Sequence, residues 1–93
     1  MAKKTVHLSI KGRVQGVWYR AWTRETALGL HLNGWVRNRM DGSVEALVSG
    51  EEDAVAQLVE KCWEGPTAAR VDNIIITDTD EEAPAGFAQE RTI

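Results

Sequence analysis

A glycine-flanked turn that ends in a cation is the part of this chain best suited to chemistry. Residues 12–20 read GRVQGVWYR and join a run of alternating polar and apolar residues to a run with helical spacing. The backbone N–H groups of such a turn can point to one place, and a guanidinium can close that place from the side. An anionic phosphoryl or carboxyl group requires this arrangement. The segment therefore predicts an oxyanion site that includes Arg20.

A purely structural interpretation of the same turn is also open. The glycines would then supply positive φ angles in a tight strand-to-helix connection, and Arg20 would be a solvated residue of the first helical turn. The segment matches neither GxxxxGK[ST] nor GxGxxG, because Gly12 and Gly16 are only four residues apart and no Lys-Ser or Lys-Thr follows. We therefore expect no nucleotide site here.

Length and charge limit the possible functions. The chain has 93 residues, of which 43% are hydrophobic, so we expect one compact domain over residues 1–93 and no second domain. The net charge of −3 argues against a general nucleic-acid-binding surface, which would have to neutralise many phosphates. A local group of arginines can still bind one small anion. The candidates for that group are Arg13, Arg20, Arg37 and Arg39.

Cysteine and histidine usage indicates neither a disulfide framework nor a metal site. Cys62 is the only cysteine, and His7 and His31 lack the spacing of zinc ligands. The residues after Lys3 and Lys4 alternate in polarity, unlike the apolar core of a signal peptide, and the sequence contains no long apolar stretch. We expect a reduced cytoplasmic setting, no metal or other cofactor, and neither a membrane nor a nucleic acid as partner.

Hydrophobic periodicity predicts the elements that must position the turn. Alternation of Val6, Leu8 and Ile10 with polar residues predicts a first strand, which the glycine turn interrupts. Helical spacing begins at about Trp18. The buried face of this first helix is expected to contain Tyr19, Thr23, Ala27 and Leu30.

The rest of the chain predicts a hairpin, a second helix and one or two further strands. Strands at 35–40 and 43–48 flank Asp41-Gly42, a dipeptide typical of hairpins. The acidic residues 51–53 suit a helix N-terminus, and Gly65-Pro66 ends that helix. A fourth strand at 71–76, an acidic loop at 78–86 and a weak strand near 87–91 follow. The expected apolar face of the second helix is Val55, Leu58, Val59 and Cys62.

This order of elements, β-α-β-β-α-β with a possible short fifth strand, predicts an α+β fold of the ferredoxin-like, split βαβ type. Two helices would cover one face of an antiparallel sheet. Because this architecture carries many unrelated functions, it assigns no activity by itself.

The turn and the second strand together closely resemble the acylphosphatase family. GRVQGVWYR at residues 12–20 is followed by GWVRN at 34–38 and DGSVE at 41–45, and the resemblance extends through the second helix. Members of that family are small metal-independent enzymes that hydrolyse acyl phosphates. The resemblance implies an enzyme with a small-molecule acyl phosphate as substrate and inorganic phosphate as product and inhibitor. We expect it to be monomeric and to need no cofactor.

The resemblance also implies roles for single residues. Arg20 would bind the phosphoryl group, and Asn38 would orient the attacking water. Trp18-Tyr19 stand where members often have a small or aromatic residue followed by Phe, and His31 stands where Gly is common, which questions the geometry at the end of the first helix. The residues implied in phosphate binding, largely through backbone amides, are Gln15, Gly16, Val17, Trp18, Tyr19 and Arg20.

For the other reactive side chains we favour structural roles. His7 is expected on the surface of the first strand instead of facing the site, and Cys62 is expected as a buried thiol instead of a nucleophile. Tyr19 is expected to pack beneath the turn, with a partner for its hydroxyl at the edge. Core packing, as opposed to base stacking, is expected for Trp22, Trp35 and Trp63.

Three other functions are compatible with the fold. An RNA-recognition module would need a K/R-G-F/Y-type signature, a metal carrier would need a Cys-x-x-Cys turn, and neither motif occurs in the sequence. An acylphosphatase-like domain that holds a carbamoyl or acyl phosphate for a larger assembly is a nearer alternative. We expect a free-standing enzyme, whose physiological acyl phosphate the sequence does not name.

Overall fold

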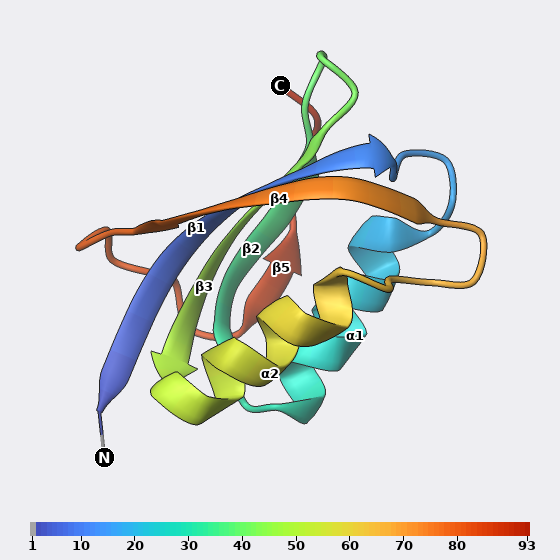
Figure 1. Ribbon diagram of the computed structural model, residues 1–93. Helices are drawn as coiled ribbons and strands as arrows, with labels where there is room; N and C mark the ends of the chain where they lie inside the picture. Colours follow the sequence, from blue (N-terminus) through green and yellow to red (C-terminus); the bar gives the residue numbers. More distant parts are fainter. Residues whose placement is uncertain (1) are drawn as a thin grey trace.

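The computed structural model describes residues 2–93, in which two helices cover one face of a five-stranded sheet (Figure 1). This arrangement confirms the predicted order of elements and includes the short last strand. Neither helix among these residues is long and apolar enough to cross a membrane. The elements are β1 (Lys3–Arg13), α1 (Tyr19–Gly29), β2 (Asn33–Asn38), β3 (Val44–Glu51), α2 (Glu52–Cys62), β4 (Arg70–Asp78) and β5 (Phe87–Gln89).

The sheet is mixed, which corrects the prediction of an antiparallel sheet. Its strand order is β4-β1-β3-β2-β5, and the pairs among β1 to β4 are antiparallel as expected. β5 instead pairs in parallel with β2, through Gly34 opposite Phe87 and Val36 opposite Gln89. Because β4 runs opposite to β2 and the following connection reverses the chain once, β5 enters the sheet in the direction of β2. The parallel pair brings Gln89 close to the end of β2.

The first strand is longer than predicted. Gly12 was expected in the turn, but β1 continues to Arg13, and its register against β4 shifts between Lys11 and Gly12. Gly12 has a φ of +134°, and a β-carbon there would lie 2.2 Å from the Arg70 carbonyl oxygen. Glycine is therefore required in this bulge by the close approach of another strand. The turn between β1 and α1 begins only after Arg13.

The core lies between the sheet and the helices, on the faces that periodicity predicted. Val6, Leu8 and Ile10 of β1 are buried. On α1 Thr23 is buried together with Tyr19 and Ala27, while Leu30 is half-buried, and Val55, Leu58 and Cys62 are the buried residues of α2, with Val59 half-buried. These contacts hold α1 against β2 and β5, and α2 against β1 and β3.

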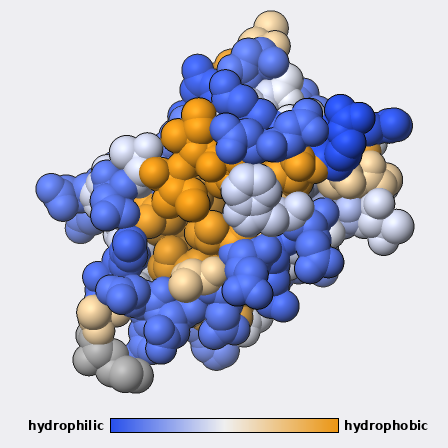
Figure 2. Space-filling model, viewed as in Figure 1, coloured by the Kyte–Doolittle hydropathy of each residue, from blue (hydrophilic) through white to orange (hydrophobic). Residues whose placement is uncertain are grey.

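The tryptophans are less buried than predicted. Trp22 is half-buried against the core, whereas Trp35 lies on the helix-free face of the sheet, where the Arg37 guanidinium carbon is 4.3 Å from its ring centroid. Trp63 is 45% exposed. It borders an apolar groove between α2 and the β1–β4 pair, visible as an apolar patch in Figure 2. Core packing is therefore the wrong description for Trp35 and Trp63.

Candidate active site

The connection between β1 and α1 has several backbone N–H groups without an acceptor in the described part of the chain. Gly16 and Trp18 both adopt left-handed conformations, with φ values of 74° and 68°. Left-handed residues that alternate with others curl successive N–H groups into a concave nest for anions. Within residues 2–93, no backbone N–H of residues 15–18 donates a hydrogen bond to another group. These donors remain available to a ligand.

The N-terminus of α1 adds to this positive potential. Trp18 is its N-cap residue, no side chain accepts a hydrogen bond from the first turn, and no acidic residue lies in that turn. An uncapped helix N-terminus carries a partial positive charge and favours an anion. A bulky side chain in the left-handed region is uncommon and costs about 1 kcal/mol or more. The Trp18 side chain itself is 82% exposed.

Gln15 fastens the turn to the β2–β3 hairpin. Its side-chain Nε2 donates to the carbonyl oxygens of Arg39 and Ser43, at 2.8 Å in both cases. The sequence indicated Gln15 only as part of the amide cradle, because nothing local predicts a partner more than 20 residues away. The two bonds fix where the turn lies relative to the residue before Arg39, which is Asn38.

Tyr19 anchors the opposite side of the turn in the core. Its side chain is 1% exposed, and its hydroxyl donates to the Cys62 carbonyl oxygen at 2.5 Å. Burial, together with its proximity to Cys62, raises the pKa of Tyr19 well above its ordinary value. The predicted packing of Tyr19 is confirmed, but its partner lies in the interior instead of at an edge. The Tyr19 hydroxyl is therefore engaged in the core and is not free to contact a ligand.

Cys62 is a buried thiol, as predicted, and not a nucleophile. It is fully buried, and burial raises its pKa to about 12. A thiol in that state is protonated near neutral pH and is chemically inert. Val17, with 5% exposure, is likewise held in the core by its side chain. The buried side chains of Val17 and Tyr19 thus hold the turn against the core, while the N–H groups of residues 15–18 have no acceptor among residues 2–93.

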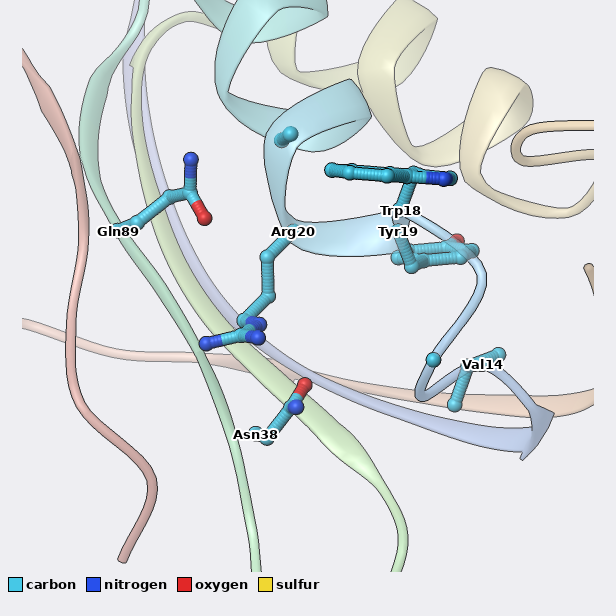
Figure 3. A pocket seen from close by; sticks show the side chains of 8 residues that line it. Val14, Trp18, Tyr19, Arg20, Asn38 and Gln89 are labelled. Carbon is cyan, nitrogen blue, oxygen red and sulfur yellow. The ribbon is translucent and has the colours of Figure 1, made fainter.

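Arg20 extends from the first turn of α1 into a cavity of about 370 Å³. Figure 3 shows its guanidinium between Asn38 and Gln89. Among residues 2–93 it forms neither an ion pair nor a hydrogen bond, in contrast to Arg37, Arg39 and Arg70. A guanidinium without a protein partner beside free N–H groups is suited to a bidentate contact with a phosphoryl group. The cavity is lined by Val14, Gly16, Trp18, Tyr19, Arg20, Ala21, Asn38 and Gln89.

Asn38 lies at the end of β2, opposite Val44 of β3, and lines the same cavity. It is only 9% exposed, and its Oδ1 is the one buried side-chain oxygen or nitrogen without a hydrogen-bond partner among the described residues. Buried acceptors are almost always satisfied, so such an orphan marks a place for a water or ligand. The chain around it is secured by Ile93, whose N–H donates to the Asn38 carbonyl and whose carbonyl accepts from the Met40 N–H.

On the other face of the sheet, the Glu45 carboxylate of β3 accepts hydrogen bonds from three side chains. It accepts from Arg37 Nε at 2.7 Å, from Arg39 Nη1 at 3.2 Å and from His7 Nε2 at 2.5 Å. Burial alone would raise the pKa of Glu45, but the hydrogen bonds outweigh it and hold that pKa below its ordinary value. We call Glu45, His7, Arg37 and Arg39 the Glu45 cluster. His7 therefore faces away from the cavity, as expected.

The structure thus brings most of the sequence-predicted residues to one cavity, although they come from separate elements: Gly16, Trp18, Tyr19, Arg20 and Asn38. The other two predicted residues, Gln15 and Val17, do not line it. Sequence reasoning missed Gln89 and Glu45. Gln89 reaches the cavity only because β5 pairs in parallel with β2, which no local pattern announced.

Comparison with known proteins agrees with this geometry. The sequence model of the acylphosphatase family matches residues 6–89. The chain belongs to the acylphosphatase family. It is 51% identical to an acylphosphatase from Rhodospirillum rubrum over 97% of this chain and 99% of that protein, and 50% identical to one from Rhizorhabdus wittichii over 92% and 87%.

A solved acylphosphatase structure from Coxiella burnetii superposes on 95% of the chain and 93% of its own length, with a TM-score of 0.91 at 36% identity. The agreement confirms the ferredoxin-like α+β fold. Together with the relatives, it identifies this member of the acylphosphatase family as a hydrolase.

Proposed function

We propose that this acylphosphatase-family hydrolase cleaves the carboxyl–phosphate bond of an acyl phosphate by in-line attack of water. Arg20 and the N–H groups of residues 15–19 bind the phosphoryl group, and Asn38 orients the water. One observation carries the proposal. The free guanidinium of Arg20, the unpartnered Asn38 Oδ1, and Gly16 and Trp18, whose N–H groups have no acceptor, all border a single cavity.

The chemistry needs little beyond positioning and charge. The water oxygen forms a bond to phosphorus while the bond from phosphorus to the acyl oxygen breaks, and the carboxylate leaves with the electron pair. A carboxylate is a good leaving group, so no acid has to protonate it. The phosphoryl oxygens carry negative charge throughout the transfer, and the preorganised Arg20 and turn N–H groups can stabilise it better than water does. The proton of the attacking water passes to a phosphoryl oxygen, which balances the products as carboxylate and inorganic phosphate.

Asn38 is suited to placing water and unsuited to removing its proton. A carboxamide can accept a hydrogen bond through Oδ1 and donate through Nδ2, but it is a very weak base. Its burial and the backbone bonds to Ile93 limit its motion. Correct placement of two reactants lowers the barrier substantially without any proton transfer to the protein.

The source of positive charge in the site bears on metals, cofactors and inhibition by phosphate. Positive charge comes from Arg20 and backbone amides, so we propose that turnover needs no metal and no cofactor. Inorganic phosphate resembles the bound phosphoryl group and would compete with substrate as product. We further propose that the protein is a cytoplasmic monomer of one domain.

The decisive assay is phosphate release from benzoyl phosphate, with p-nitrophenyl phosphate as the phosphomonoester control. We expect turnover of the first and not of the second, unchanged by EDTA and by Cys62→Ser. Loss of activity in EDTA that added Mg²⁺ restores would contradict the metal-independent mechanism. Tight phosphate binding without turnover of benzoyl phosphate would instead indicate a domain that only holds the substrate.

A further inference from the structure

The cavity is larger than the phosphoryl group and the attacking water require. Its volume is about 370 Å³. At about 30 Å³ for each water-sized atom, the attacking water and the four atoms of a phosphoryl group account for roughly 150 Å³. The remaining space lies within the same walls and is open to the acyl end of the substrate.

The position of the acyl end follows from in-line attack. The water and the leaving oxygen must lie on opposite sides of phosphorus. With the water on Asn38, the leaving oxygen lies on the side of the phosphoryl group away from Asn38. Figure 3 shows Asn38 and Gln89 on different sides of the Arg20 guanidinium, with both side chains directed toward the cavity.

Besides the Trp18 indole, which is 82% exposed, Gln89 is the side chain in this region whose donors no described residue engages. The Tyr19 hydroxyl already donates to Cys62, and Ala21 and Val14 have no polar side-chain atom. Gln89 forms no hydrogen bond through its side chain with any residue in 2–93, and it lies on β5 at the register position of Val36, two residues before Asn38. Its Nε2 can therefore donate to a ligand without first breaking a protein contact.

We propose that Gln89 forms the subsite for the acyl end, with its side-chain N–H donating to the carboxyl oxygen that leaves. This inference rests on the proposed function and extends it from the phosphoryl group to the leaving group. The remaining walls, Ala21 and the exposed Trp18 indole, suit an uncharged acyl chain. The substrate class is therefore an acyl phosphate with a small, uncharged acyl group.

The benefit of this contact is greatest in the transition state. Phosphoryl transfer has a loose transition state in which the bond to the leaving group is largely broken. Negative charge on the leaving oxygen is then much larger than in the bound substrate, and a donor placed there stabilises the transition state selectively. Poor leaving groups, which carry this charge least well, should depend on Gln89 most.

The test measures kcat/KM for acetyl phosphate and for benzoyl phosphates with substituents that vary the acidity of the leaving acid. In Gln89→Leu we expect about a tenfold loss with the least acidic leaving acid, the size of one net hydrogen bond, and a smaller loss with the most acidic. The dependence of rate on leaving-acid pKa should become steeper. The inhibition constant of inorganic phosphate should stay within about twofold, because phosphate has no acyl end.

Glu90→Gln is the matched control, because Glu90 is the exposed neighbour of Gln89 and does not line the cavity. It should reproduce the wild-type dependence, and thermal melting should show that Gln89→Leu is folded. Parallel dependences for wild type and Gln89→Leu would overturn the acyl subsite, as would a phosphate affinity that falls in proportion to kcat/KM. Failure of the wild type to release phosphate from any of these compounds would overturn the proposed function itself.

Discussion

The two faces of β2 around Asn38 differ in how completely their polar groups are satisfied. On the helix-covered face, the Asn38 Oδ1 and the Arg20 guanidinium have no partner among residues 2–93. On the other face, Arg37 and Arg39 both donate to Glu45, which also accepts from His7. Residues 37, 38 and 39 are consecutive, so the alternation of a strand places free groups on one side and paired groups on the other.

This difference shows how a small domain can keep polar groups free for a ligand. An unsatisfied buried acceptor costs free energy and tends to move toward any available donor. The Glu45 cluster on the opposite face links β2 to β1 and β3 through hydrogen bonds, and Gln15 ties the turn between β1 and α1 to the same hairpin. The unpaired site is thus supported by the paired cluster.

The largest expected effect is on the free face, at Arg20. Arg20→Ala should lower kcat/KM by roughly 10³-fold or more, with losses in both KM and kcat, because the guanidinium binds the phosphoryl group before and during transfer. Arg20→Lys should recover little, since an ammonium lacks the planar fork. Steady-state kinetics give kcat and KM, and inhibition by phosphate gives the affinity of the site for the phosphoryl group.

Arg24→Ala is the control for Arg20, because Arg24 is an exposed arginine one turn later on α1 and outside the cavity. It should behave as wild type. Equal losses in the two variants would mean that general positive charge, and not the free guanidinium, is what matters.

Asn38 should show the next largest effect. Asn38→Ala should lower kcat by roughly 10²-fold while phosphate still binds, since one well-placed polar group is lost. Asn38→Asp should be no better, because its carboxylate would repel the phosphoryl oxygens and pair with Arg20. Measuring kcat and the phosphate inhibition constant separately distinguishes a loss of water placement from a loss of phosphate binding. Near-native turnover of Asn38→Asp would contradict the water-orienting role of Asn38 and would favour general-base catalysis instead.

The paired face should affect stability more than chemistry. Glu45→Gln should lower the free energy of unfolding near neutral pH by about 2 kcal/mol, because it leaves the donors of the Glu45 cluster without a charged acceptor. The pKa of Glu45 is lowered from its ordinary 4.5, so its stabilisation is present above that value and is lost as pH falls through the folded-state pKa. Urea unfolding from about pH 7 to about pH 3 should show a shallower acid loss in the variant.

Glu25→Gln serves as the comparison for Glu45, since Glu25 is exposed on α1 and forms no ion pair in the described part of the chain. We expect it to change stability by less than about 0.5 kcal/mol. An identical acid dependence in wild type and Glu45→Gln would show that the cluster does not support the fold as inferred.

The smallest expected effect separates strain at the site from strain elsewhere. Trp18 and His31 stand at opposite ends of α1, and both are left-handed, with φ values of 68° and 61°. Only Trp18 belongs to the cavity. His31→Gly should therefore raise stability by up to about 1 kcal/mol without altering kcat, because glycine adopts this conformation without strain. A clear fall in the melting temperature would reveal a stabilising contact of His31.

The sequence by itself determined the features that depend on local periodicity and local conformation. Alternation in β1 and helical spacing in α1 and α2 predicted the buried faces, and Asp41-Gly42 predicted the hairpin. The buried faces and the hairpin need no knowledge of distant residues, since each follows from its own neighbours in the sequence. That Arg20 and Asn38 would share a site was instead implied by the resemblance of residues 12–20 and 34–38 to the acylphosphatase family.

Only the tertiary structure decided the contacts between distant segments. The bulge at Gly12 depends on the approach of Arg70, the tether of Gln15 on the carbonyls of Arg39 and Ser43, and the Glu45 cluster on the register of β1 against β3. The place of Gln89 depends on the parallel entry of β5. Each of these contacts joins strands or loops that are far apart along the chain. Their separation in the sequence has no periodic pattern, so only the register of the folded sheet selects the partners.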